Sequence, residues 1–250
     1  MQTLLPTDAI AELNERFETA EPAEIVRWAL EDSGLERVAL ASAFQAEGTC
    51  VMHMASLIRP DVEVLFLETG FHFAETLAFK EQLAERLGLT VIDLVGPYTV
   101  EQQAGELGER LYETDPQRCC EINKVQPMFE ALQKLDGWVT AYRRDSSPTR
   151  ANAPIVDQYE LEADSWIVKV NPVVNWTRAD TLAYLEANDL PHNPLYELGY
   201  TSIGCAPCTR MRFEGEHERS GRWAGLSKWE CGIHERESRQ RTIDLTLDEH

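Results

Sequence analysis

Four cysteines fall in two pairs that together could hold a metal group. Cys119 and Cys120 are adjacent, and Cys205 and Cys208 form a C-x-x-C pair much later in the chain. Four thiolates suit either an iron-sulfur cluster or a structural zinc ion. Zinc sites usually draw paired ligands two to four residues apart, whereas each iron corner of a cubane cluster can take one of two neighbouring cysteines. The spacing favours a 4Fe-4S cluster and leaves zinc open.

A fifth cysteine, Cys231, has neighbours that suit a reactive thiol. It lies in a Lys-Trp-Glu-Cys-Gly-Ile-His segment, three residues before His234. The thiolate is the attacking form of cysteine, and nearby positive charge stabilises it. His234 and the arginines of this region are candidates for that role, although the local sequence fits a spare surface cysteine equally well. The sixth cysteine, Cys50, stands in an apolar run and is expected in the core.

Composition limits the partners of the chain. It has 250 residues, 43% of them hydrophobic, and a formal net charge of -20. Such a charge repels nucleic acid phosphates, so we expect no nucleic acid partner, and an anionic substrate needs a local basic pocket. No apolar run approaches the roughly 20 residues that span a bilayer, and no secretory signal is evident. We expect a soluble, cytoplasmic protein without a membrane partner, whose cysteines serve metal binding or catalysis.

The elements that must position these residues alternate between strand and helix, which predicts a doubly wound, mostly parallel α/β sheet. Strands are expected at Val38–Ala41, Val62–Leu67, Val91–Leu94, Trp138–Ala141 and Trp166–Val170, and helices at Cys50–Ile58, Ala74–Leu87 and about Arg178–Asn188. Ligands of such sheets bind beyond the carboxyl ends of the strands. The segments there are Ser42–Gly48, Glu68–Gly70 and Tyr142–Arg150, and we expect all three to face one nucleotide.

The chain divides into one main domain and two flanks. Residues 1–35 are expected to form a helical flank, because apolar residues recur there at helical spacing. Residues 36–208 are expected to form the nucleotide-binding α/β domain with the metal site. Residues 209–250 have few aliphatic side chains and are predicted to form a flexible arm that carries Cys231.

The two cysteine pairs and the Glu-Cys-Gly-Ile-His segment at 230–234 together resemble the assimilatory adenylyl-sulfate reductase family, which is related to phosphoadenylyl-sulfate reductases. The similarity extends from about Val38 to His234. It implies a fold of the adenine-nucleotide alpha-hydrolase-like type, a 4Fe-4S cluster on the paired cysteines, and adenylyl sulfate as substrate. It also implies that Cys231 forms a thiosulfonate, which thioredoxin or glutaredoxin discharges as sulfite. By family analogy alone, a homo-oligomer is expected.

The resemblance also assigns site residues. It implies catalytic roles for Cys231 and His234, and a place for Lys124 between cluster and substrate. Substrate contacts are implied for the R-x-x-R pair Arg219 and Arg222, for Arg143, Arg144 and Arg150 of an R-R-x-x-S-P-T-R segment, for Ser42 and Phe44 of a modified nucleotide loop, and for Thr69 and Gly70. The nucleotide segments depart from the family pattern at Gln45, Gly48, Glu68 and Phe71.

Three other functions stay open. The first is reduction of phosphoadenylyl sulfate, or of both nucleotides, because no dedicated 3'-phosphate site is evident. The second is an ATP-pyrophosphatase that adenylates its substrate, suggested by the strand, loop and helix expected over Leu40–Val51; the loop lacks the S-G-G-x-D-S pattern that cradles pyrophosphate. The third is a metal-stapled interaction module, which would leave Cys231 and the R-x-x-R pair without a role.

Overall fold

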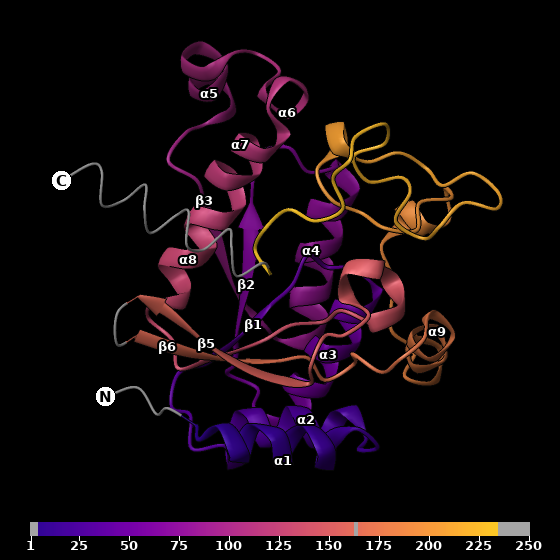
Figure 1. The fold of residues 1–250 in the computed structure, drawn as a ribbon. Coiled ribbons are helices and arrows are strands. Elements are labelled where there is room, and N and C mark those ends of the chain that lie inside the picture. The colour runs from indigo at the N-terminus through magenta and orange to yellow at the C-terminus, as the bar shows by residue number, and fades with distance from the viewer. Residues whose placement is uncertain (1–4, 163–164, 235–250) are drawn as a thin grey trace.

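A six-stranded sheet forms the centre of the computed structural model, which describes residues 5–162 and 165–234 (Figure 1). Its strands are β1 (Val38–Ala41), β2 (Glu63–Glu68), β3 (Thr90–Val95), β4 (Gly137–Val139), β5 (Val156–Glu162) and β6 (Ser165–Val170). They are ordered β3-β2-β1-β4-β6-β5. All neighbouring pairs are parallel except β5 and β6, which are antiparallel at one edge. The predicted doubly wound, mostly parallel sheet is confirmed.

Helices connect these strands and flank the sheet. They are α1 (Thr7–Phe17), α2 (Pro22–Arg27), α3 (Ala46–Ile58), α4 (Ala74–Leu87), α5 (Val100–Leu107), α6 (Leu111–Thr114), α7 (Pro116–Cys120), α8 (Gln126–Leu132) and α9 (Arg178–Ala187). Wider π-helical turns follow α2 at Trp28–Asp32 and α7 at Glu121–Val125, and short 3-10 turns cover Arg144–Ser146, Pro148–Arg150, Pro194–Tyr196 and Ala206–Cys208. Within the described ranges, no helix is both long enough and apolar enough to cross a membrane.

Alternate residues of the central strands enter two separate apolar layers. In β1, Val38 and Leu40 pack into one layer and Ala39 into the other. Helices α2, α3, α4 and α9 contribute to the first layer, and α8 contributes to the second. Side chains of a strand point to opposite faces in turn, so helices on both faces bury both sets. Cys50 of α3 lies fully buried in the first layer, as expected.

The strand order creates a switch point between β1 and β4. From β1 the chain moves through β2 to β3 on one side, and then returns to add β4 on the other side of β1. Connections leaving the carboxyl ends of β1 and β4 therefore diverge and open a crevice, the usual ligand site of such sheets. Figure 1 shows α7 and the yellow segment beyond residue 209 at the end of the sheet to which the β2 arrow points.

Two features depart from the expected elements. Helix α3 begins at Ala46, four residues before the expected start at Cys50, so the last three residues of the predicted loop Ser42–Gly48 are the first turn of a helix. Strand β5 was not expected, because charged and amide residues interrupt its apolar positions. It is an edge strand, and one side of an edge strand needs no neighbour and tolerates polar residues.

The described part of the predicted arm, residues 209–234, is packed against the sheet domain. Thr209 pairs with Arg222 as an isolated antiparallel bridge. Arg219, Arg222 and Trp223 are all less than 10% exposed, and Ile233 packs on the apolar layer that contains α8. The arm is thus an ordered cover in this conformation, and its mobility stays a prediction. Residues 235–250 lie outside the described residues.

Candidate active site

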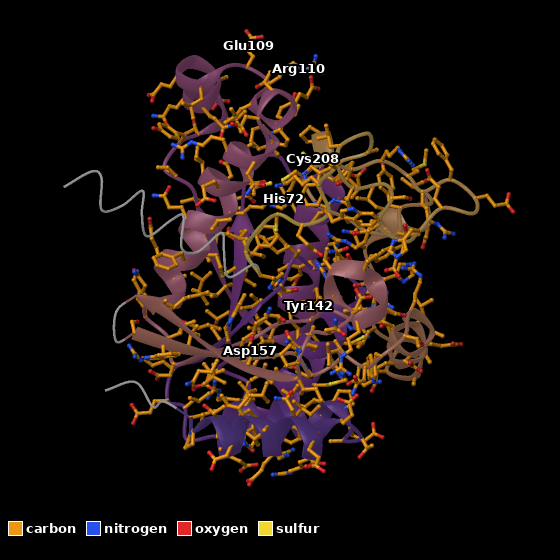
Figure 2. The ribbon with its side chains drawn as sticks, viewed as in Figure 1. His72, Glu109, Arg110, Tyr142, Asp157 and Cys208 are labelled. Carbon is orange, nitrogen blue, oxygen red and sulfur yellow. The ribbon has the colours of Figure 1, made fainter. Side chains whose placement is uncertain are left out.

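A cavity opens at the switch point of the sheet, between the strand ends and the arm. The strand ends contribute Ala41 and Ser42 after β1 and Thr140 and Tyr142 after β4. In the view of Figure 2, His72 lies above Tyr142. Most of the expected site residues line this cavity, namely Ser42, Lys124, Arg150, Arg219, Arg222, Cys231 and His234. Segments that are distant in the sequence therefore meet in one site.

A second, small cavity beside the first is lined by Cys119, Cys120, Cys205 and Cys208 together. The adjacent pair ends α7, a short helix that begins with Pro116 and is capped by the Asp115 side chain, which accepts a hydrogen bond from the Arg118 amide. The other pair flanks the 3-10 turn at Ala206–Cys208. Lys124 lines both cavities and so separates the four cysteines from the switch-point cavity.

Polar side chains lie beside the four thiols. Within residues 5–162 and 165–234, no three His, Cys, Asp or Glu side chains are arranged so that they could hold a metal ion. Side-chain donors already face two of the sulfurs: Asn123 Nδ2 lies 3.6 Å from Cys119 Sγ, and Thr69 Oγ1 lies 3.3 Å from Cys205 Sγ. Hydrogen bonds to ligand sulfurs are typical of iron-sulfur sites. The common lining of the four thiols and these two donors therefore fit a set of cluster ligands.

Charge in this region is shared between Lys124 and the thiols. Burial raises the pKa of Cys119 to about 11 and that of Cys120 to about 12. Desolvation opposes the charge of Lys124, but the neighbouring Cys205, Cys120 and Cys231 raise its pKa above the usual value. Burial likewise opposes a Cys205 thiolate, and Lys124 outweighs it and lowers the pKa of Cys205. Lys124 therefore carries a positive charge between the sulfurs and the larger cavity.

Arg222 offers positive charge to the cavity with few competing contacts. Its side chain is 8% exposed and stacks over the Trp223 ring, with the guanidinium carbon 4.5 Å from the ring centroid. Its guanidinium donates a long hydrogen bond of 3.4 Å to the Ile203 carbonyl, and its Nε has no partner among the described residues. A Cβ at Gly204 would lie 2.2 Å from Arg222 Nη2, so the glycine leaves room for the guanidinium.

Arg219 is held on one side by the arm itself. Its Nη2 donates to the Trp229 carbonyl at 2.8 Å and to Glu230 at 3.2 Å. Its Nε is buried and has no hydrogen-bond partner among the described residues. Burial and the nearby Arg150 guanidinium lower the pKa of Arg219 to about 10, so it remains charged at neutral pH.

Glu230 pairs with both Arg150 and Arg219. Its carboxylate accepts two hydrogen bonds of 2.8 Å from Arg150, through Nε and Nη2, and a third of 3.1 Å from Thr149. Arg150 in turn stacks over the Tyr142 ring at 4.6 Å. Burial opposes the charge of Glu230, but Arg150 outweighs it and lowers the pKa of the carboxyl group.

Cys231 and His234 complete the arm side of the cavity. Cys231 is partly exposed. The His234 ring stacks on Trp138 with centroids 5.5 Å apart and meets the Tyr142 ring edge-on at 4.9 Å. Aromatic residues in and beyond β4 therefore fix the histidine three positions after the cysteine.

Two expected substrate contacts, Arg143 and Arg144, do not line the cavity. The Arg143 side chain is fully buried and bonds to Glu47 at 2.8 Å and to Glu218 at 2.6 Å. Arg144 bonds to Glu18, which follows α1. The charges of these two side chains are thus already neutralised. Of the three arginines predicted in this loop, Arg150 alone lines the cavity among the described residues.

Of the expected contacts of the nucleotide segments, one lines the cavity and the others lie elsewhere. Ser42 lines the cavity, and its Oγ accepts a hydrogen bond from the Phe44 amide at 3.0 Å. The Phe44 side chain points into the core, where its ring meets Phe66 edge-on at 5.5 Å. Thr69 faces Cys205, and Gly70, with φ 72°, forms the turn beside it. A Cβ at Gly48 would lie 2.4 Å from Ser42 Oγ, which explains why glycine occupies this position.

Several residues of the cavity were given no role from the sequence, among them His72, Gln45 and Glu230. His72 bonds through Nε2 to the Leu67 carbonyl at 2.8 Å, and burial lowers its pKa, so it is neutral near pH 7. The Gln45 side chain accepts a hydrogen bond from the Ile203 amide at 2.8 Å and ties the first strand loop to the segment before Cys205. Glu230 stood in the terminal motif without a role. A signal existed for the first two, because both follow the carboxyl end of a strand.

Comparisons with known proteins cover most of the chain. A family model described as the phosphoadenosine phosphosulfate reductase domain matches residues 37–211. The chain is similar to adenosine 5'-phosphosulfate reductase of Streptomyces coelicolor, with 41% identity over 232 residues that cover 91% of this chain and 96% of the relative. It resembles the crystal structure of phosphoadenylyl-sulfate reductase from Candida auris, with a TM-score of 0.70, 26% identity, and coverage of 83% and 98% of the two chains. A likeness to FMN adenylyltransferase of Candida glabrata, with a TM-score of 0.55, 13% identity, and coverage of 98% and 84%, concerns the fold alone.

Proposed function

This chain belongs to the phosphoadenosine phosphosulfate reductase family, and from that premise we propose that it reduces adenylyl sulfate to sulfite and AMP with Cys231 as nucleophile. It is an oxidoreductase that acts on a sulfur group. The observation that carries the proposal is the switch-point cavity, where Cys231 meets Lys124 and Arg222. Neither cation forms a salt bridge to a carboxylate among the described residues, and a dianionic sulfonucleotide would supply the missing negative charge.

In the first step, the Cys231 thiolate attacks the sulfuryl sulfur of the substrate. A sulfur-sulfur bond forms as the bond from sulfur to the bridging phosphate oxygen breaks, and the electron pair of that bond leaves with AMP. Lys124, Arg219 and Arg222 offset charge on the sulfate oxygens and on the leaving phosphate. His234, held on Trp138, completes the donor set beside the nucleophile. The product on the enzyme is a Cys231 thiosulfonate.

In the second step, a dithiol protein of the thioredoxin or glutaredoxin type supplies two electrons. One of its thiolates attacks the Cys231 sulfur, so sulfite leaves with the electron pair of the sulfur-sulfur bond and a mixed disulfide remains. The second thiolate of the partner then breaks this disulfide and returns Cys231 to its starting form. The partial exposure of Cys231 supports such an exchange, because the partner must reach this sulfur.

We further propose that Cys119, Cys120, Cys205 and Cys208 hold a 4Fe-4S cluster. Support comes from their common cavity and from the donors of Thr69 and Asn123 that face two of the sulfurs. When bound, the cluster supplies a fixed charged group that orders the site and tunes its electrostatics, and it is not consumed as the electron source. Anaerobically purified protein is expected to be brown, whereas a zinc protein is colourless.

Adenylyl sulfate is favoured over phosphoadenylyl sulfate by the charge of the cavity. Two of its four Lys and Arg side chains, Arg150 and Arg219, already share the carboxylate of Glu230. That carboxylate offsets one of the four positive charges. The three that remain are enough for the two negative charges of adenylyl sulfate and too few for the four of the 3'-phosphorylated nucleotide. Rates measured with both nucleotides test this preference, and a faster reaction with phosphoadenylyl sulfate would reverse it.

The nucleophile is tested by trapping the intermediate. Anaerobically reconstituted protein is incubated with adenylyl sulfate without reductant and analysed by intact mass and peptide mapping. A sulfonate-sized gain on the Cys231 peptide is expected, absent in Cys231→Ser and discharged as sulfite by thioredoxin. Absence of the adduct in brown, cluster-loaded protein would rule out Cys231 as the sulfur acceptor.

A further inference from the structure

We propose that Glu230 is a positioning residue whose contacts with Arg150 and Thr149 hold the arm across the cavity and thereby fix the position of the Cys231 sulfur. We call these contacts the latch. The inference rests on the proposed function for its catalytic consequence, although the latch itself is a property of the fold. Glu230 belongs to the arm, whereas Thr149 and Arg150 belong to the loop after β4. Their contacts therefore join two parts of the chain that are distant in sequence. On the arm, the contact is made by the residue that directly precedes the nucleophile.

Regular backbone structure does not fix this stretch of the arm. Residues 227–233 make no backbone hydrogen bond to another described backbone group. They are held by side chains instead, and Lys228 reaches Gln117 from an exposed position. The Glu230 side chain is only 7% exposed, and both of its oxygens are engaged by Arg150, Thr149 and Arg219. A buried ion pair with two hydrogen bonds from Arg150 therefore anchors the segment next to Cys231, on the side opposite the apolar contacts of Ile233 and His234 in sequence.

The same carboxylate also orients a substrate-binding cation. The Glu230 carboxylate and the Trp229 carbonyl both accept hydrogen bonds from Arg219 Nη2. The buried Nε edge of Arg219 has no protein partner among the described residues. That edge remains available to an anion in the cavity. Glu230 thus neutralises part of the positive charge while it fixes the geometry.

Because of these two roles, removal of the carboxylate should affect substrate binding and the rate of the chemical step differently. Without it, Arg150 and Arg219 become uncompensated, so an anionic substrate should bind as well as before or more tightly. At the same time the nucleophile loses its anchor, so the chemical step should slow. A residue that only maintained the fold would weaken binding and slow the reaction together.

The test compares Glu230→Gln with Glu216→Gln in the anaerobically purified full chain. Glu216 is the matched control, because it also forms an arm ion pair, with Arg210 at 2.7 Å, but does not line the cavity. The first readout is the rate at which iodoacetamide alkylates Cys231, followed by peptide mapping. The second is single-turnover formation of the Cys231 adduct over a range of adenylyl sulfate concentrations.

In Glu230→Gln, alkylation of Cys231 is expected to accelerate about tenfold, and the maximum rate of adduct formation to fall about tenfold, because breaking a buried ion pair releases the segment. The half-saturating substrate concentration should stay constant or fall. Glu216→Gln should match the wild type in both readouts. Alkylation of Glu230→Gln at the wild-type rate, or a half-saturating concentration that rises as the rate falls, would overturn the latch.

Failure of the proposed function is separable from failure of the latch. If wild-type protein forms no adduct, the assignment of Cys231 is wrong, while the alkylation rates still decide whether Glu230 restrains the segment. If Glu230→Gln does not fold, Arg150→Gln removes the same ion pair from the other side. It should show the same accelerated alkylation, and an unchanged rate would overturn the proposal.

Discussion

Arg222 and Lys124 differ from Arg150 and Arg219 in having no carboxylate partner among the described residues. The difference arises from single neighbours. Gly204 lets the Arg222 guanidinium approach the backbone, and Lys124 lies beside cysteine sulfurs and, in the part of the chain that the structure describes, not beside a carboxylate. Binding of a small anion therefore depends on one glycine as well as on the cations themselves.

Gly204→Ala is expected to weaken substrate binding without harming the fold. The new methyl group would lie 2.2 Å from Arg222 Nη2 and 2.4 Å from its Cζ, so the flexible guanidinium must move. The half-saturating concentration of adenylyl sulfate should rise about tenfold or more, since a hydrogen bond to a charged group contributes about 1.5–3 kcal/mol. Substrate titrations and urea unfolding of the same samples measure the two effects.

Gly105→Ala provides the control for this change. Gly105 lies in α5, and no atom comes within 4 Å of the position that an alanine Cβ would take, so alanine fits there freely. Substrate binding should be unchanged, and the free energy of unfolding should rise slightly, because alanine has a higher helix propensity than glycine. Unaltered affinity in Gly204→Ala would contradict the role assigned to Arg222.

At the same scale, the sequence predicted residue types better than side-chain directions. Cysteine spacing pointed to the paired thiols, and the family resemblance implied roles for Cys231, Arg219 and Arg222; the structure brings all of them to two adjoining cavities. Phe44 and Arg143 were expected at the substrate, yet they face the core and a cluster of carboxylates. Their direction depends on tertiary neighbours such as Phe66 and Glu218, which are distant in the sequence.

Helix α7 shows how a short element can position two of the proposed cluster ligands. It has five residues, too few to be stable alone, and its last two are Cys119 and Cys120. Its start depends on Pro116 and on the Asp115 side chain, which accepts a hydrogen bond from the Arg118 amide at 2.9 Å. Placement of the adjacent cysteines therefore depends on a cap that lies outside the pair.

Asp115→Ala is expected to reduce the iron content of the purified protein. Loss of an N-cap costs about 1 kcal/mol of helix stability. Because α7 is so short, its loss of order should extend to the cysteine pair at its end. Thr177→Ala is the control, because Thr177 forms the capping box of α9, which does not line the cysteine cavity. Both variants should lose similar stability in urea unfolding, but iron analysis should show a loss only in Asp115→Ala. Equal iron contents would argue against this role of the cap.

Elements were predicted where burial enforces a clear pattern. The bounds of α4 matched the expected range, and β1 did likewise, because each has one continuous apolar face or run. The arm gave no such signal, since residues 227–233 are held by side-chain contacts and not by regular structure. A fold held by distant ion pairs leaves no periodicity in the sequence.

The whole molecule has a formal charge of -20, yet its cavity collects positive side chains. Acidic residues therefore have two roles. Most keep the surface hydrated, and a few form ion pairs with arginines inside the fold. Asp136 is of the second kind. It accepts hydrogen bonds from the Arg37 amide at 2.9 Å and from Arg37 Nη2 at 2.8 Å, and so joins the residues that precede β1 and β4, the two strands of the switch point.

This pair predicts how stability depends on pH. Burial opposes the charge of Asp136, but hydrogen bonds from Arg37 outweigh it and lower the pKa of the carboxyl group in the folded state. The carboxylate therefore stabilises the fold fully above the unfolded-state pKa of about 4, and this contribution is lost as the pH falls through the folded-state value. Asp136→Asn should be less stable than the wild type at pH 7 by about 1–3 kcal/mol.

The difference in unfolding free energy between Asp136→Asn and the wild type should shrink as the pH falls below about 4, because both side chains are then neutral. Urea unfolding at several pH values measures it. Asp61→Asn is the control, since Asp61 is exposed and should change stability little at any pH. A difference that stays constant down to acid pH would mean that the amide disturbs packing, and that the charge of Asp136 does not hold β1 and β4 together at the base of the site.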